Sequence, residues 1–191
     1  MQRKVIPSIL FFLLYFLSPL FALPADVEPL NNRDYFPKVL RVISEAKKEV
    51  KIVMFSAIRY TSTNYRNSPS NRIFESLASA VKRGVLVEVI FEDGGGMISK
   101  NDSFSLDNRP VAQWLAKKGV NVYFDTPGRT THAKLMIIDR QAVLLGSANW
   151  TYSGLMRNNE AGAILKSEEL AAEYIRYFEE VKKVSTKYID K

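Results

Sequence analysis

The chain has 191 residues, a formal net charge of +7, one histidine and no cysteine. This length provides for one hydrophobic core but is too short for two catalytic halves. Without cysteine, neither a disulfide framework nor lipid attachment at a cysteine is available, and a single histidine argues against a zinc site. The basic balance favours polyanionic or anionic-surface partners, although many soluble proteins share it.

The first 25 residues have the pattern of a secretory signal peptide, in which a short basic start precedes an apolar run from Val5 to Leu23. Cleavage after Ala22 or Ala25 would export the protein to the periplasm or the medium. An uncleaved membrane anchor is the alternative, because the run approaches the length of a membrane-spanning helix. We favour cleavage, since Pro7 and Pro19 interrupt the run.

Residues 26–34 are polar and contain Pro29, so we expect a linker there and a folded domain over residues 35–191. Apolar residues recur at helical spacing in four later segments, which are residues 36–48, 71–83, 110–118 and the segment after Ser167. The last of these predicts core packing or a dimer contact. Apolar strands are expected over residues 50–55, 85–91 and 120–124. This alternation predicts a single α/β domain, in which a mixed β-sheet is sandwiched between helices.

Two loops that follow predicted strands contain candidate binding residues. In the first, Arg59 could contact a phosphate, and Tyr60 offers a face on which a base could stack. An ordinary solvated loop is the alternative interpretation. The second loop, residues 92–96, reads Glu-Asp-Gly-Gly-Gly. It lacks the spacing and the lysine of a nucleotide-binding loop, so a flexible turn is the better interpretation.

The segment from residue 132 to residue 160 combines a predicted hairpin with polar residues. His132 and Lys134 stand two apart in one predicted strand, and Ser147 and Asn149 stand two apart at the end of the next. Side chains two apart in a strand share a face. Residues 139–141 are short enough to close an antiparallel hairpin, and an even number of turn residues would bring both pairs to one side of the sheet.

These four side chains are suited to phosphate chemistry. Histidine can act as nucleophile or proton carrier near neutral pH, lysine supplies a positive charge, and serine and asparagine add donors. Gly146 suits a place where the backbone runs close to a neighbour, because glycine has no Cβ.

The motif His132-x-Lys134, then Asp139, then Gly146-Ser147-x-Asn149, resembles the HKD signature of the phospholipase D superfamily. Glu160 falls where small members of that family carry a glutamate beside the histidine. The resemblance implies a phospholipase D-like fold and a phosphodiesterase that needs no metal and no cofactor.

The resemblance also implies roles for the motif residues. His132 would attack phosphorus and form a phosphohistidine that water then releases, while Lys134, Ser147 and Asn149 hold the non-bridging oxygens. Glu160 would orient the imidazole and stabilise its charge. The odd offset of Asp139 from His132 places it on the other strand face, so we interpret Asp139 as structural.

A small exported chain with one motif is most similar to the family's non-specific periplasmic endonuclease, so we expect nucleic acid as the substrate. A phospholipase D that hydrolyses phospholipid headgroups is the alternative. A non-catalytic protein that binds nucleic acid or membrane surfaces is the second alternative, and the intact motif argues against it. Arg129, three residues before His132, is either a substrate contact or a surface charge. Because one chain supplies one histidine, we expect a homodimer with a shared active site.

Overall fold

The computed structural model describes residues 22–63, 66–94 and 108–190. Its strands are β1 (Asp26–Pro29), β2 (Glu49–Met54), β3 (Leu86–Phe91), β4 (Asn121–Phe124), β5 (Lys134–Ile138), β6 (Ala142–Gly146), β7 (Gly162–Lys166) and β8 (Thr186–Lys187). Its helices are the 3-10 turn η1 (Asn32–Asp34), α2 (Tyr35–Glu45), α3 (Pro69–Lys82), α4 (Arg109–Ala116), α5 (Tyr152–Met156) and α6 (Glu168–Val184).

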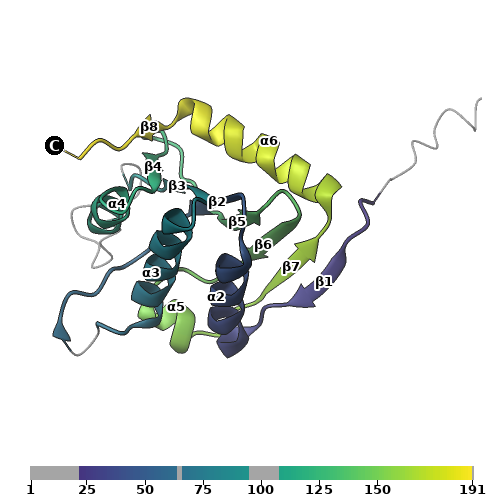
Figure 1. Ribbon diagram of the computed structural model, residues 1–191, viewed down its shortest axis with the longest axis horizontal. Helices are drawn as coiled ribbons and strands as arrows, with labels where there is room; N and C mark the ends of the chain where they lie inside the picture. The colour runs from purple at the N-terminus through teal and green to yellow at the C-terminus, as the bar shows by residue number, and fades with distance from the viewer. Residues whose placement is uncertain (1–21, 64–65, 95–107, 191) are drawn as a thin grey trace, which may run out of the picture.

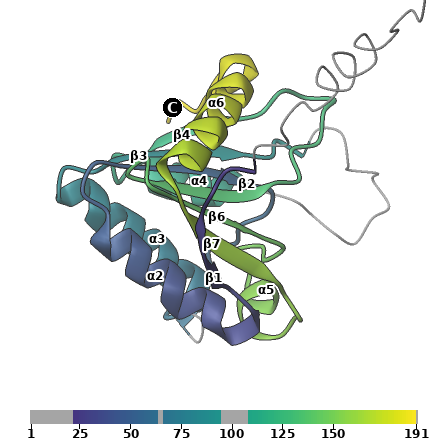
Figure 2. The ribbon, with the colours of Figure 1, turned by 90° about the vertical axis from the view of Figure 1, so that its right-hand side faces the viewer.

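The strands form one sheet in the order β1-β7-β6-β5-β2-β3-β4-β8 (Figure 1). β2 pairs with β3 in parallel and with β5 in antiparallel orientation, so the sheet is mixed. α2 and α3 cover one face, and α6 crosses the other, as Figure 2 shows from the side. The predicted α/β architecture, with a mixed sheet between helices, is confirmed.

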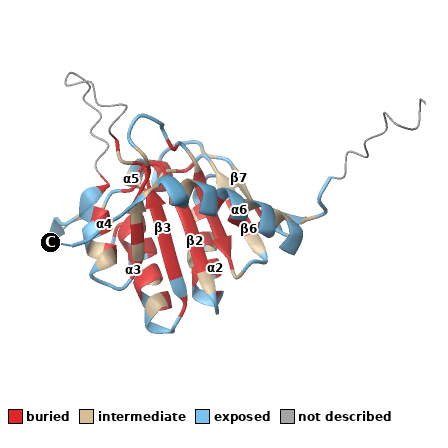
Figure 3. Cartoon of the chain, turned by 90° about the horizontal axis from the view of Figure 1, so that it is seen from above, coloured by how far each residue is buried: buried red, intermediate tan, exposed pale blue. Residues whose placement is uncertain are grey.

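The central strands lie deepest in the molecule. Figure 3 shows β2 and β3 almost entirely buried, and both consist largely of apolar residues because helices cover both faces. One hydrophobic cluster lies under α2, α3 and α4, and a smaller one lies under α6. α6 is also held by charge, since buried Glu88 accepts hydrogen bonds from Lys51 and Lys182, both at 2.5 Å. This docking fixes α6 as one wall beside the end of β5.

The N-terminal part of the described chain corrects the predicted linker over residues 26–34. Asp26–Pro29 forms the edge strand β1, which pairs antiparallel with β7 from Asp26 opposite Lys166 to Pro29 opposite Ala163. An edge strand tolerates proline and needs no apolar alternation, so its sequence resembles that of a linker. Residues 1–21 of the predicted signal peptide lie outside the described residues. No helix within the described ranges is long and apolar enough to cross a membrane.

The β5–β6 hairpin closes through a turn of three residues. Ile138 pairs with Ala142, and Asp139 and Arg140 in the turn have φ values of 51° and 61°. An even number of turn residues, which was the condition for bringing both polar pairs to one side of the sheet, is therefore not met in this hairpin. By register Lys134 stands opposite Gly146, and a straight continuation of both strands would put Ser147 on the other face. The position of Ser147 consequently depends on the path that the chain takes beyond the end of β6.

Candidate active site

His132 and Lys134 lie where β5 begins, in the middle of the sheet. The ladder between β2 and β5 continues past the strand, because the Phe55 N–H donates to the Ala133 carbonyl at 3.0 Å. This bond fixes the backbone between the two motif residues. The His132 side chain is exposed, whereas Lys134 is buried with 7% of its surface accessible.

The Lys134 ammonium lies against the imidazole. Its Nζ is 3.3 Å from Nδ1 and 3.2 Å from Nε2 of His132, and it donates to the His132 carbonyl at 2.8 Å. Phe55 lies beneath both groups, with its ring centre 4.4 Å from that of His132 and 4.6 Å from Lys134 Nζ. The aromatic ring therefore supports the histidine and the lysine together.

The surroundings shift the pKa values of both groups downward. Burial lowers the pKa of His132, and the neighbouring Lys134 charge lowers it further. Burial also lowers the pKa of Lys134, and the Glu160 charge opposes that shift. The imidazole is thus kept neutral to lower pH than an ordinary histidine, which is the protonation state that a nucleophile needs.

Ser147 and Glu160 form a bonded unit at the ends of β6 and β7. The Ser147 hydroxyl donates to Glu160 Oε2 and accepts from the Ala161 N–H at 3.1 Å, while Asn158 donates to Glu160 Oε1 at 3.0 Å. Both oxygens of the Glu160 carboxylate are thus hydrogen-bonded, one to Ser147 and the other to Asn158. The sequence-based hypothesis assigned Glu160 to the imidazole, whereas in the structure its charge acts on Lys134 and its hydrogen bonds go to Ser147 and Asn158.

Two glycines allow this close approach of β6 and β7. A Cβ on Gly146 would lie 3.2 Å from the Ala161 carbonyl, and one on Gly162 would lie 2.6 Å from the Leu145 carbonyl. Beyond Gly146 the Ser147 N–H donates to Ala161 at 3.0 Å, so Ser147 follows the β7 side of the site. This local path brings Ser147 to the Glu160 carboxylate, whose charge acts on Lys134. Regular strand alternation would instead have placed Ser147 and Lys134 on opposite faces of the sheet.

Asn149 has hydrogen-bonding capacity to spare. Its side chain is half-buried, and its Oδ1 is buried without a hydrogen-bond partner among the residues that the structure describes. The backbone of Asn149 packs tightly against α5, since a Cβ on Gly154 would lie 2.5 Å from the Asn149 carbonyl. The backbone of Asn149 is consequently fixed by this packing, while one acceptor atom of its side chain stays without a protein partner in the described part of the chain.

The predicted substrate-binding residues lie in two different places. Arg129 and His132 line one cavity of about 250 Å³ against α6. Arg59 and Tyr60 instead line a second cavity of about 380 Å³ with Trp114, whose ring lies 5.1 Å from the Arg59 guanidinium. Arg129 therefore shares a cavity with the histidine, whereas Arg59 and Tyr60 line a different one.

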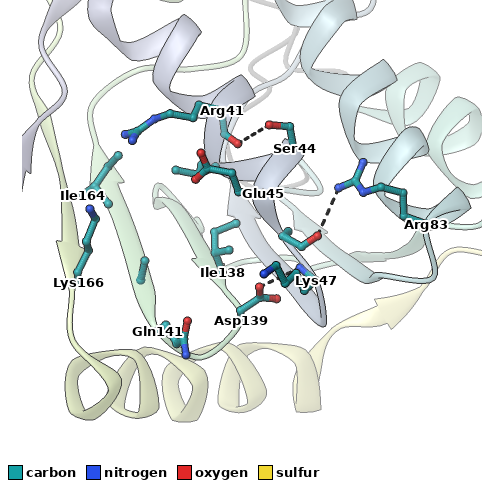
Figure 4. A pocket seen from close by; sticks show the side chains of 13 residues that line it. Arg41, Ser44, Glu45, Lys47, Arg83, Ile138, Asp139, Gln141, Ile164 and Lys166 are labelled. Atoms are coloured by element: carbon teal, nitrogen blue, oxygen red, sulfur yellow. Dashed lines mark hydrogen bonds between the residues drawn. The ribbon is translucent and has the colours of Figure 1, made fainter.

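Asp139 lies at the opposite end of the hairpin from His132. Its carboxylate accepts backbone N–H groups of Lys47, Lys48 and Glu49 at 2.7–3.0 Å. Burial alone would raise the pKa of Asp139, but these three hydrogen bonds outweigh it and lower the pKa. A larger cavity of about 740 Å³ lies at this end, with Arg83 and Lys166 among its lining residues (Figure 4). Asp139 thus has a structural role far from the imidazole.

Sequence patterns did not identify two features that support the site. Phe55 was assigned to a strand and not to the platform under His132. Glu92 was assigned to a flexible turn, yet it is buried and accepts the Thr131 N–H immediately before His132 at 2.5 Å. A useful signal was available, since polar residues that directly follow adjacent parallel strands meet at one sheet edge.

A family model described as "Cardiolipin synthase, PLD-like domain" matches residues 39–182. The chain belongs to the phospholipase D superfamily. Membership of this superfamily supports phosphodiesterase activity and leaves the substrate to be identified.

Curated relatives of this phospholipase D-like chain include mitochondrial cardiolipin hydrolases. The mouse protein is 24% identical over 151 residues, which cover 79% of this chain and 59% of the relative. The human protein is 30% identical over 100 residues, which cover 52% of this chain and 36% of the relative. The matched part of the chain therefore spans less than two thirds of the length of these relatives.

Solved structures show the same fold. Nuc from Salmonella typhimurium, a phospholipase D family member, superposes with a TM-score of 0.71 at 20% identity, over 87% of this chain and 100% of that chain. NucT from Helicobacter pylori gives a TM-score of 0.64 at 18% identity, over 86% and 100% of the two chains.

Proposed function

We propose that this protein is a metal-independent phosphodiesterase that cleaves the nucleic acid backbone through a phosphohistidine on His132. The observation that carries the proposal is the contact between the Lys134 ammonium and the imidazole, at 3.2 Å from Nε2. Positive charge beside the nucleophile lowers its pKa and is available to the developing charge on phosphorus without a metal ion.

The remaining polar groups fit the two halves of the reaction. Ser147 and Asn149 lie just beyond the end of β6. The side-chain N–H groups of Asn149 can donate to non-bridging phosphate oxygens, and the Ser147 hydroxyl can do so once it releases Glu160. Glu160 fixes Ser147 and balances the charge of Lys134. The step forms a bond from the imidazole nitrogen to phosphorus and breaks the bond from phosphorus to the leaving oxygen. Water then attacks the phosphohistidine and regenerates the imidazole.

The leaving oxygen needs a proton, and the described site contains one imidazole. A homodimer would supply a second imidazole across a twofold axis, with one histidine attacking while its partner, protonated, serves the leaving group. The signal-like leader is consistent with action in the periplasm or medium.

Nucleic acid is favoured as the substrate by the net charge, which is +7 for the whole chain and +5 without Arg3 and Lys4 of the leader, and by Arg129, which lines the same cavity as His132. The compact neighbours Nuc and NucT, which the chain covers completely, agree with a single-domain enzyme of this size. Phospholipid is the second candidate, because the matching relatives bear the name cardiolipin hydrolase.

A substrate panel separates the two candidates. Wild type and His132→Ala are incubated in excess EDTA with plasmid DNA, RNA, cardiolipin vesicles and phosphatidylcholine vesicles. We expect wild type alone to cleave nucleic acid and to do so with EDTA present. Release of headgroups without strand cleavage would transfer the assignment to phospholipids, and activity restored by magnesium or zinc would contradict the metal-independent mechanism.

A further inference from the structure

Two buried carboxyl groups lie beneath the segment that leads to His132. Glu92 follows β3 and Asp125 follows β4, and these parallel strands end with Phe91 opposite Phe124. The two acids are therefore the next pair in register. Glu92 has 2% and Asp125 has 3% of its surface accessible. Buried acids of this kind need partners for every charged oxygen.

The partners of the pair leave one oxygen unsatisfied. Glu92 accepts the N–H groups of Thr131 and Gly94 at 2.5 and 2.9 Å, one on each oxygen, and Asp125 Oδ1 accepts the Asp93 N–H at 2.8 Å. Asp125 Oδ2 is buried without a hydrogen-bond partner among the described residues. A proton on one carboxyl group would complete the set, because it would donate to the other.

The charges around the pair favour retention of that proton. Burial raises the pKa of Glu92, and the Asp125 carboxyl group raises it further against two backbone hydrogen bonds that lower it. Other titratable or charged groups face this region from four elements. Asp93 lies in the loop after β3, Arg109 begins α4, Arg129 and His132 lie in the loop before β5, and Tyr177 and Glu180 lie on α6. Arg109 is bonded to Asp93 at 2.9 Å, and the negative charge of Asp125 adds to burial in raising the pKa of Tyr177.

The pair is connected to the catalytic histidine through backbone atoms on both sides of the imidazole. Glu92 holds the Thr131 N–H just before His132, and Phe55 holds the Ala133 carbonyl just after it. Buried Asn108 joins the two supports, because its amide donates to the Phe55 and Glu92 carbonyls, both at 2.9 Å. Only the Glu92 support can titrate.

We propose that Glu92 and Asp125 share one proton and act together as positioning residues that hold the backbone of His132 in place for attack. The pair acts through the peptide of Thr131 and touches neither substrate nor phosphorus. The proposal rests on the proposed function in so far as His132 is the nucleophile. Loss of the shared proton leaves two ionised carboxylates side by side, and their repulsion loosens the segment before the histidine.

The sign of the effect follows from the raised pKa. A carboxyl group whose folded-state pKa lies above its unfolded value contributes stability below the unfolded pKa, and that contribution is lost as pH rises through the folded pKa. Asp125→Asn replaces the titrating proton with a permanent amide donor and retains the acceptor for Asp93. In that variant the neighbouring negative charge that raises the pKa of Glu92 is removed and an amide donor is added, so the loss of stability with rising pH is not expected.

The test is an NMR titration of the sole histidine, combined with denaturant unfolding across the same pH series. We expect wild type to show a second inflection in the His132 signal, and a fall in stability, as the pair loses its proton. Both should disappear in Asp125→Asn and persist in the control Asp93→Asn, which changes the neighbouring acid. These readouts need no substrate, so they can fail or succeed independently of the proposed nuclease activity.

A second variant, Glu92→Gln, tests the same proposal if Asp125→Asn fails to fold. Glu92→Gln donates to Asp125 but loses an acceptor for Thr131 or Gly94, so kcat should fall ~10–100-fold with little change in KM. A single His132 inflection in wild type, with the same pH dependence of stability in wild type and Asp125→Asn, would overturn the proposal. An equal change in KM and kcat in Glu92→Gln would also count against positioning.

Discussion

The two ends of the β5–β6 hairpin differ in how completely their polar groups are bonded. At the turn, Asp139 accepts three backbone N–H groups, and a cavity of about 740 Å³ lies beside it. At the other end, His132 is exposed and Asn149 Oδ1 has no partner among the described residues. The charge of Lys134 there adds to burial in lowering the pKa of His132. Saturated bonding stabilises a fold, whereas an exposed histidine beside a lysine charge, with spare bonding capacity nearby, is typical of a reactive site.

The largest effect is expected at the exposed end. His132→Ala removes the nucleophile, so kcat should fall by ~10³-fold or more. The free energy of unfolding should change by less than ~0.5 kcal/mol, because the side chain is exposed. Steady-state kinetics and denaturant unfolding of the same preparation measure both quantities. Retained turnover in a purified variant would show that another group attacks phosphorus.

Lys134→Met separates the charge from the packing of the side chain. We expect kcat to fall ~10²–10³-fold, as for a lost donor to transition-state charge. The pKa of His132 should rise, because one of its two causes of depression is removed. In wild type the neutral nucleophile is lost as pH falls through the lowered pKa, so the acid limb of kcat/KM should move to higher pH in the variant. An unchanged histidine titration by NMR would contradict the proposed contact.

Subunit mixing tests whether the exposed end is completed by a partner. After exchange, His132→Ala subunits should form heterodimers with wild type that lack one of the two histidine roles. Specific activity should then fall faster than in proportion to the mutant fraction. A proportional fall with demonstrated exchange, or a fully active monomer in sedimentation, would exclude the shared site.

The smallest effect on chemistry is expected at the bonded end. Asp139→Ala leaves three N–H groups without their acceptor and should cost ~1–3 kcal/mol of stability, with little change in kcat for the folded fraction. Asp139→Asn, which retains one acceptor oxygen, should cost less. Because the folded pKa of Asp139 is lowered, its stabilisation is present above the unfolded pKa and is lost as pH falls through the folded pKa. A large loss of kcat in a fully folded Asp139→Ala would remove the contrast between the two ends.

Much of the architecture was predictable because it follows from local patterns. Apolar periodicity located the central strands and main helices, and Ser167 caps α6 by accepting the Leu170 N–H. The edge strand β1 was missed because its pairing with β7 is non-local and leaves no alternation in Asp26–Pro29. Edge pairing of this kind can be recognised only once the partner strand is placed.

The site was predictable in its residues but not in its contacts. Residue spacing identified His132 and Lys134 as candidates. Because the hairpin turn has three residues, strand register alone would place Ser147 on the wrong face of the sheet. Its position depends on the glycine contacts between β6 and β7. The buried acids Glu92 and Asp125 were not recognised, because their roles arise from the parallel neighbours β3 and β4, which are distant from the motif in sequence.

The most direct test of the account is to trap the covalent intermediate. A reaction with labelled substrate is quenched in alkali, where phosphohistidine persists, and the digested protein is examined by mass spectrometry. Since the chain has one histidine, an adduct on a histidine has one assignment. We predict an adduct on the peptide that contains His132, in which the phosphorus still carries the retained nucleotide, transient in wild type and absent from His132→Ala. Full turnover without an adduct at any time point, or an adduct on a different residue, would contradict the central claim that His132 is the nucleophile.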